Sequence, residues 1–299
     1  SRYCSSEWRP HNNKYKADWE GAKLKVCLAF PDVYEIGMSY YGFQIIEALI
    51  HSLDKNYIAD RVYAVWPDME KLMLENNINL ISTEHKKYIK DFDVLAFTLP
   101  HEAAYTNILS MINLAGLPLK SQDRDNKDFP LVIAGGYGDY VPEVMREFID
   151  VFCIGDAEAL LPDLLPVIEG TKNFSRDERL RELAKLPGIY VPLCSESGKE
   201  ITRQISQKIF KLDSMIVPSV NIVHVRAAIE LFRGCSRGCR FCQAGMVNRP
   251  VRERDIGSAK ESILSIIKST GWEEVGLLSL ASCDYSGIAE LIDSLSGEL

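Results

Sequence analysis

A short apolar run, Lys25-Val26-Cys27-Leu28-Ala29-Phe30, passes directly into Pro31-Asp32-Val33-Tyr34-Glu35-Ile36-Gly37, and a helical pattern continues from Gly37 to His51. The apolar run has the length of a buried strand, far below the roughly 20 residues that a membrane-spanning helix needs. The two segments therefore predict one strand followed by one helix.

The same alternation continues as far as Gly170. The later apolar runs are Arg61 to Val65, Asp93 to Thr98, Leu131 to Ala134 and Val151 to Ile154. Helical patterns follow at Asp68 to Asn76, Glu102 to Ala115, Pro142 to Phe148 and Ala157 to Glu169. Strands that alternate with helices of this length predict an α/β fold with a parallel, doubly wound, Rossmann-like sheet and helices on both faces.

The ends of the predicted strands carry glycine and polar residues. Asp32, Tyr34 and Gly37 follow the first strand, and Gly135 and Gly136 follow the fourth. Ligands of doubly wound sheets bind at the carboxyl ends of the strands. These residues fit a ligand site, and they equally fit ordinary turns between strand and helix.

The composition indicates a soluble cytoplasmic protein. The 299 residues are 46% hydrophobic and 25% charged, with a net charge of −8, which argues against broad attraction to nucleic acid or to a membrane surface. Eight cysteines, most of them in apolar strand-like contexts, favour a reducing compartment over a disulfide framework. Because the chain begins at Ser1 and stops at Leu299 inside an apolar periodic segment, we expect a fragment of a longer protein.

We expect four parts along the chain: an N-terminal arm at 1–23, the Rossmann-like domain at 24–170, a connector at 171–223 and a third region at 224–299. The connector contains the helical pattern Ser175 to Lys185 and strand-like pieces at Ile189 to Leu193 and Gln204 to Leu212. The third region again predicts strand, helix and strand, at Ala228 to Phe232, Ser258 to Ser269 and Val275 to Leu280.

Three cysteines follow the first strand of the third region within Arg233-Gly234-Cys235-Ser236-Arg237-Gly238-Cys239-Arg240-Phe241-Cys242. The spacing C-x3-C-x2-C, on a loop with glycines at 234 and 238, indicates that the thiols bind a common soft metal centre. A structural zinc site needs four ligands, and only His224 and Cys283 are near candidates for the fourth. Electron-transfer clusters normally use four cysteines. Three cysteines therefore favour an iron–sulfur cluster with one open iron.

The alternative is a zinc-stabilised nucleic-acid-binding module without enzymatic activity. Its support is the run of six arginines between 233 and 254 (233, 237, 240, 249, 252 and 254), opposed only by Glu253. That run is compatible with a solvated loop and with an anion-binding surface. RNA binding with a steep salt dependence would identify the second function.

The cysteine loop, including Phe241 before the last cysteine, resembles the cluster motif of the radical S-adenosylmethionine (radical SAM) superfamily. The resemblance implies a 4Fe-4S cluster on Cys235, Cys239 and Cys242 that binds S-adenosylmethionine. One-electron reduction then cleaves the sulfonium and starts radical chemistry. It also implies a partial TIM-like barrel that begins with Ala228 to Phe232, and Phe241 near the adenine.

Further contacts follow from the same resemblance. The usual Gly-Gly-Glu at the end of the second barrel strand is missing, so Ser279 and Ser282 are the candidates to hold the methionine amino group, or they simply close the strand. Asp284 and Tyr285 would line the substrate pocket by position. A one-electron reductant such as flavodoxin or ferredoxin is implied, as are the remaining barrel strands or a fused domain, because only 57 residues follow Cys242. If the substrate is RNA, the arginines would contact phosphates.

The first domain resembles the cobalamin-binding domain of cobalamin-dependent radical SAM proteins. Together with Asp-Val-Tyr-Glu-Ile-Gly at 32–37 and Ser-Cys-Asp-Tyr at 282–285, it resembles an uncharacterised bacterial radical SAM family. The cobalamin motif Asp-x-His-x-x-Gly falls on Asp32, Tyr34 and Gly37, so tyrosine replaces the histidine that supplies a nitrogen to cobalt. Cobalamin then binds without that ligand, or does not bind.

Overall fold

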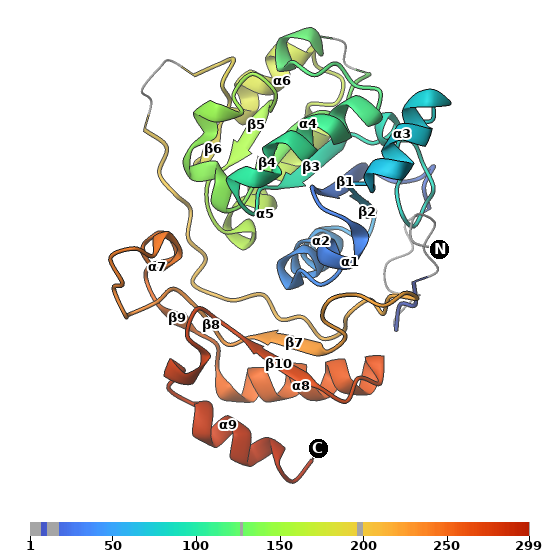
Figure 1. Cartoon of the computed structure of the whole chain (residues 1–299). Coiled ribbons are helices and arrows are strands. Elements are labelled where there is room, and N and C mark those ends of the chain that lie inside the picture. Colours follow the sequence, from blue (N-terminus) through green and yellow to red (C-terminus); the bar gives the residue numbers. More distant parts are fainter. Residues whose placement is uncertain (1–6, 11–17, 126–127, 196–199, 299) are drawn as a thin grey trace. The chain divides into compact units, whose positions relative to one another are not determined.

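A computed structural model describes residues 7–10, 18–125, 128–195 and 200–298 (Figure 1). The chain divides into two compact units. The first extends to Ile205, and the second begins at Ser206 and includes residues 7–10. The predicted connector, 171–223, spans this division, and the boundaries of the four predicted parts stay predictions. Among the described helices, none has both the length and the apolar character to cross a bilayer.

The first unit is built on a six-stranded sheet in the order β2-β1-β3-β4-β5-β6 (Figure 1). Neighbouring strands from β2 to β5 pair in parallel, and β6 pairs antiparallel with β5. This confirms the predicted α/β fold with a mainly parallel sheet. The strands are β1 (Leu24–Phe30), β2 (Tyr57–Tyr63), β3 (Val94–Thr98), β4 (Leu131–Gly135), β5 (Val151–Cys153) and β6 (Ile189–Tyr190).

Helices cover both faces of this sheet. On one face, α3 (Pro67–Glu75) and α4 (Tyr105–Leu114) bury alternate strand side chains such as Cys27, Val132 and Phe152. On the other face, α2 (Tyr41–Leu53) packs against β2 and against α5 (Ala157–Gly170) (Figure 1). Short helices are α1 (Tyr34–Gly37) and α6 (Arg176–Leu183). Adjacent residues of a strand point to opposite faces of the sheet. Strands that are apolar along nearly their whole length therefore need helices on both faces.

Three expected elements differ from the structure. The second strand begins at Tyr57, four residues before the predicted Arg61. Pro142 to Phe148 was predicted as a helix, but only a 3-10 turn forms at Pro142–Val144. The piece Gln204 to Leu212 forms no strand and contributes one isolated parallel bridge, Gly155 with Gln204. The prediction was wrong at these places because the segments are short and their partners are distant in sequence.

Gly155 follows β5 at the point where this bridge forms. Its φ is +142°, and an added Cβ would lie 2.2 Å from the Gln204 carbonyl oxygen. We expect Gly155→Ala to lower the free energy of unfolding of the first unit by about 1–3 kcal/mol, because the backbone must shift or stay strained. Gly170→Ala is the matched control, since no atom lies within 4 Å of its added Cβ. Urea denaturation compares the two, and equal midpoints would contradict the expectation.

The second unit contains the predicted strand, helix and strand. Its parallel strands β7 (Ala227–Glu230) and β10 (Val275–Leu278) are joined through α8 (Ile256–Thr270). The Asp255 side chain caps α8 by accepting from the Ser258 amide at 3.0 Å. Ile229, Ala259, Ile263 and Leu291 belong to its core, the last from α9 (Ile288–Leu295). An antiparallel pair that the sequence did not predict, β8 (Phe232–Arg233) and β9 (Arg252–Glu253), carries the cysteine loop between its strands.

Candidate functional site

The cysteine loop leaves β8 and ends in the short helix α7 (Gln243–Val247). The Cys235 and Cys242 side chains are half-buried, Cys239 is exposed, and all three thiols are free. The Cys242 Sγ accepts a hydrogen bond from the Gly245 amide at 3.3 Å and thereby caps α7. The Cys235 Sγ accepts from the Arg237 amide at 3.4 Å. Two of the three sulfurs are therefore oriented by backbone N–H groups.

Gly245 lies close to the first and last cysteines in space. A Cβ added to it would lie 3.5 Å from the Cys242 Sγ and 3.8 Å from the Cys235 Cβ, which is ordinary van der Waals contact. Within the described part of the chain, no three His, Cys, Asp or Glu side chains converge as a preformed metal site. The donor set nevertheless fits an iron–sulfur cluster, because three soft thiols share one exposed loop and N–H donors stabilise cluster sulfurs.

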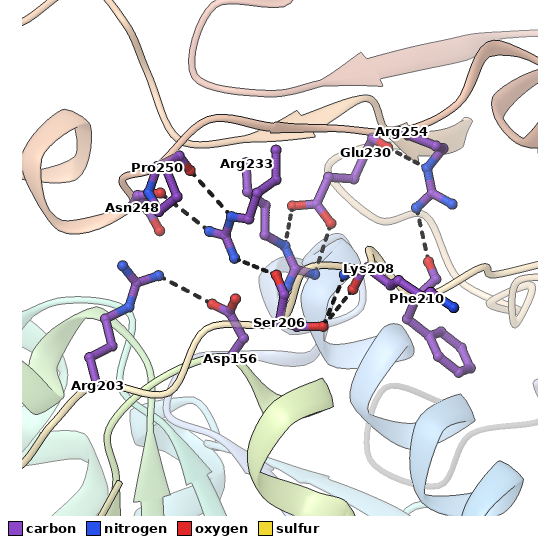
Figure 2. Close-up of polar contacts among 11 residues, drawn as sticks. Asp156, Arg203, Ser206, Lys208, Phe210, Glu230, Arg233, Asn248, Pro250 and Arg254 are labelled. Carbon is purple, nitrogen blue, oxygen red and sulfur yellow. Dashed lines mark hydrogen bonds and ion pairs between the residues drawn. The ribbon is translucent and has the colours of Figure 1, made fainter.

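The arginines of this region are mostly engaged within the second unit (Figure 2). Arg233 donates from Nε and Nη2 to the Glu230 carboxylate at 2.9 and 3.0 Å. Arg252 and Arg254 are buried, with 6% and 5% exposure, and donate to backbone carbonyl oxygens. These acceptors belong to Ser206, Phe210, Glu230, Asn248 and Pro250. These three arginines therefore hold the loop region together, which leaves a smaller cationic surface than the sequence suggested.

The other residues of the second unit that the sequence predicted to contact the cosubstrate or the substrate differ in exposure and in hydrogen bonding. The Phe241 ring is 92% exposed. The Ser279 and Ser282 hydroxyl oxygens lie 2.9 Å apart, and Ser282 donates to the Leu277 carbonyl at 3.0 Å. Tyr285 is only 2% exposed and its hydroxyl donates to the Arg254 carbonyl at 2.6 Å, so it is a packing residue and does not line an open pocket.

An ion pair that sequence reasoning missed joins the cysteine loop to the end of β10. Arg237 donates from Nε to the Asp284 Oδ2 at 2.6 Å and from Nη2 to the Oδ1. Asp284 had been selected by position alone, and its partner lies 47 residues away in sequence. No local pattern links the two residues.

In the first unit, the residues after β1 are tightly packed. The Asp32 carboxylate accepts from the adjacent Val33 amide at 2.7 Å. Tyr34 is 3% exposed and packs edge-on against Tyr63, with ring centroids 5.1 Å apart. A Cβ on Gly37 would lie 2.5 Å from the Tyr63 ring. Packing thus accounts for Tyr34 and Gly37, and their part in a cobalamin-like site stays a prediction.

The residues after β4 pass over the end of β3. The Leu99 amide donates to the Gly135 carbonyl at 2.8 Å, and the Gly138 amide donates to the Leu99 carbonyl at 3.0 Å. Gly136 has a φ of +129°, and an added Cβ would lie 2.7 Å from the Leu99 carbonyl oxygen. The backbone therefore requires glycine there irrespective of any ligand. Binding of cobalamin at Gly135 and Gly136 is likewise still a prediction.

A doubly wound sheet in one unit, and a three-cysteine loop between β8 and β9 in the other, are features of a cofactor-dependent α/β protein. Residues 42–192 match the family model described as "Radical SAM proteins, N-terminal", and the chain belongs to that family. The resemblance noted from the sequence is thereby confirmed. Members of this superfamily use a 4Fe-4S cluster and S-adenosylmethionine.

The chain also resembles individual proteins. The chain is 26% identical over 228 residues to "Uncharacterized protein MJ0966" of Methanocaldococcus jannaschii, covering 73% of this chain and 45% of the relative. It thus spans less than half the length of that curated relative.

Two solved structures of TsrM from Kitasatospora setae, a radical S-adenosylmethionine methyltransferase, resemble the chain with a TM-score of 0.58. They are 12% and 13% identical and are matched over 92% of this chain and 51% and 52% of theirs. One was solved with cobalamin and a [4Fe-4S] cluster, the other with tryptophan and aza-SAM. At this identity the likeness shows the fold, which is consistent with a partial barrel.

Proposed function

We propose that this chain is the N-terminal part of a radical SAM enzyme and holds a 4Fe-4S cluster on Cys235, Cys239 and Cys242. The observation that carries the proposal is the set of three free thiols on one exposed loop, two of them oriented by backbone amides. With three protein ligands, one iron would be left open to the amino and carboxylate groups of S-adenosylmethionine. When bound, the cluster supplies the electron that cleaves this cosubstrate and starts radical chemistry.

The chain's own residues would position the cosubstrate. The exposed Phe241 ring offers a face on which an adenine can stack. The Ser279 and Ser282 hydroxyl groups bond to each other, and their remaining lone pairs can accept from a methionine ammonium group. Both assignments are proposals, as is the placement of the three ligand cysteines.

We also propose the first unit as a cobalamin-binding-like domain. Its support is the sheet with glycine-bearing turns after β4 and the cobalamin seen in one TsrM structure. If cobalamin binds, methyl transfer to an unactivated carbon becomes accessible; if it does not, hydrogen abstraction leads to rearrangement or thiolation. Hydroxocobalamin that co-elutes with the chain would support the first route, and elution of the chain without it would exclude that route.

The partners follow from this chemistry. A one-electron reductant such as flavodoxin or ferredoxin would supply electrons in a reducing cytoplasm, and downstream barrel strands or a fused domain would complete the substrate pocket. RNA is a candidate substrate. Because the buried arginines bond to backbone carbonyls, the zinc-stabilised nucleic-acid-binding alternative gains no support from the loop.

Anaerobic reconstitution tests the proposal. We expect about four iron and four sulfide per chain, a brown chromophore, and formation of 5′-deoxyadenosine on reduction with S-adenosylmethionine. Metal and sulfide content do not depend on turnover, so they test the cluster even if this part of the enzyme is inactive. Stoichiometric zinc without sulfide would reject the proposal in favour of the alternative.

A further inference from the structure

The Arg237–Asp284 ion pair joins the cysteine loop to a rigid part of the second unit. The 3-10 turn that contains Asp284 (Ser282–Asp284) is tied to β10 by the hydrogen bond from Ser282 to the Leu277 carbonyl. On its other side, the buried Tyr285 bonds to the Arg254 carbonyl at 2.6 Å. Asp284 is thus held from both sides, and its carboxylate is a fixed anchor.

Arg237 lies on the other side of this pair, between the first two cysteines. Its side chain is 64% exposed, against 22% for Asp284, so few packing contacts other than the ion pair fix it. The planar guanidinium meets the carboxylate with two donors, Nε and Nη2, which restricts orientation as well as distance. The ion pair therefore connects a largely exposed charge on the loop to a more buried one.

Arg237 also contacts one of the thiols. Its amide donates to the Cys235 Sγ at 3.4 Å. Arg237 therefore contacts one proposed cluster ligand through its backbone and Asp284 through its guanidinium group.

We propose that Arg237 and Asp284 are positioning residues that fix the cysteine loop to the end of β10 and set the net charge beside the cluster. The inference rests on the proposed function, because it concerns the cluster held by Cys235, Cys239 and Cys242. The pair does two things. It would hold the cysteine loop beside the 3-10 turn that begins at Ser282, and it would pair the cation beside the thiolates with an anion.

The test exploits the opposite charges of the pair. The net charge around an iron–sulfur cluster is one determinant of its reduction potential. Arg237→Gln removes a positive charge and is expected to lower the midpoint potential of the reconstituted full chain, whereas Asp284→Asn removes a negative charge and is expected to raise it. A merely structural tether would shift both variants in the same direction, because either substitution breaks the same contact.

Two further measurements examine the tether itself. Both variants are expected to release iron to a chelator about 2- to 5-fold faster, a modest effect that suits a partly exposed ion pair. Hydrogen exchange of residues 235–242 in the cluster-free chain is expected to accelerate in both. Asp284→Glu keeps the charge and should retain the original potential. Glu261→Gln is the control, because it removes the exposed Lys211–Glu261 pair, with an N–O distance of 2.9 Å, in the same unit.

The outcomes separate the two proposals. If the unmodified chain binds no iron, the proposed function fails and this inference fails with it. If the unmodified chain holds the cluster, but both variants keep its potential or shift it in the same direction, the inference alone is overturned. Potentials that move in opposite directions, with Glu261→Gln unchanged, support it.

Discussion

Single replacement of Cys235, Cys239 or Cys242 by alanine is expected to reduce the iron and sulfide content of the reconstituted chain from about four each to nearly zero. The reason is the ligand count, because the open iron has no protein ligand and the loss of one thiolate leaves only two. The loop is exposed and two of its thiols contribute only N–H···S contacts to the fold, so the secondary structure should persist. Colorimetric assays measure the iron and sulfide content, and circular dichroism measures the secondary structure.

Cys283→Ala is the matched control for these variants. Cys283 is an exposed, free thiol in the turn after β10 and is adjacent in sequence to Asp284. We expect Cys283→Ala to keep the full complement of iron. If it lost iron while one of the three loop variants kept it, the ligand set would be wrong and the cluster would require a different arrangement of cysteines.

The sequence predicted those parts of the structure that depend on neighbours in the chain. The cysteine spacing and the apolar strands are local patterns, and the predicted alternation of strands and helices matches β1, β3, β4 and β5 within one residue at each end. Helix α5 was also predicted, although it contains Pro162 and Pro166. The apolar periodicity of the segment predicted a helix despite the two prolines. In the fold, burial of that apolar face against the sheet stabilises the helix in the same way.

The sequence was least informative where buried charges pair across the fold. Strand β2 was placed four residues too late, since the predicted strand began at Arg61 and left out Asp60, yet both residues are fully buried. Arg61 pairs with the buried Glu47, and the Asp60 carboxylate accepts from the His85 amide at 2.7 Å. Burial raises the pKa of Asp60, but the His85 hydrogen bond and the charge of Arg61 lower it below its ordinary value. Because these partners are far apart in sequence, the local pattern could not show that both charges are buried.

In the candidate site, too, the sequence predicted only features formed by residues that are close together in the chain. The three cysteines lie within eight residues and could be recognised by spacing. The Arg237–Asp284 contact spans 47 residues, and the pairing of β8 with β9 that supports the loop joins two short segments separated by the loop itself. Local sequence propensity predicts neither the ion pair nor the strand pairing, because both contacts form between segments that only the folded chain brings together.

A second buried charge cluster, in the first unit, gives the largest expected effect on stability. The fully buried Asp150 accepts from Arg124 Nη2 at 2.9 Å, from the Val132 amide at 2.7 Å, and from Ser121 and Arg176. It therefore connects the beginning of β5 to β4 and to α6. We expect Asp150→Asn to lower the free energy of unfolding of the first unit by about 3–5 kcal/mol, because both guanidinium groups would remain buried without a counter-charge.

Two substitutions with smaller expected losses of stability provide a scale for Asp150→Asn. Ser121→Ala removes one hydrogen bond to Asp150 and should cost about 1 kcal/mol. Glu75→Gln breaks the exposed Lys71–Glu75 pair, 3.8 Å apart, and should change stability by less than about 0.5 kcal/mol. Hydrogen exchange of β4 and β5 measures the opening of this unit separately from the second. Equal protection in all three variants would show that the cluster is not a major source of stability.

The pH dependence of the same protein gives an independent check. Burial raises the pKa of Asp150, but the charges of Arg124 and Arg176, together with hydrogen bonds from Arg124 and Ser121, lower it below the ordinary value of 3.8. A carboxyl group with a depressed pKa in the folded state contributes stability above its unfolded pKa, and this contribution is lost as the pH falls toward the folded value. The stability difference between the unmodified chain and Asp150→Asn should therefore be constant from neutral pH down to about 5 and shrink below about pH 4. A difference that grew on acidification would mean that Asp150 is protonated in the folded protein, and the Arg124–Asp150–Arg176 contacts would then be hydrogen bonds to a neutral acid.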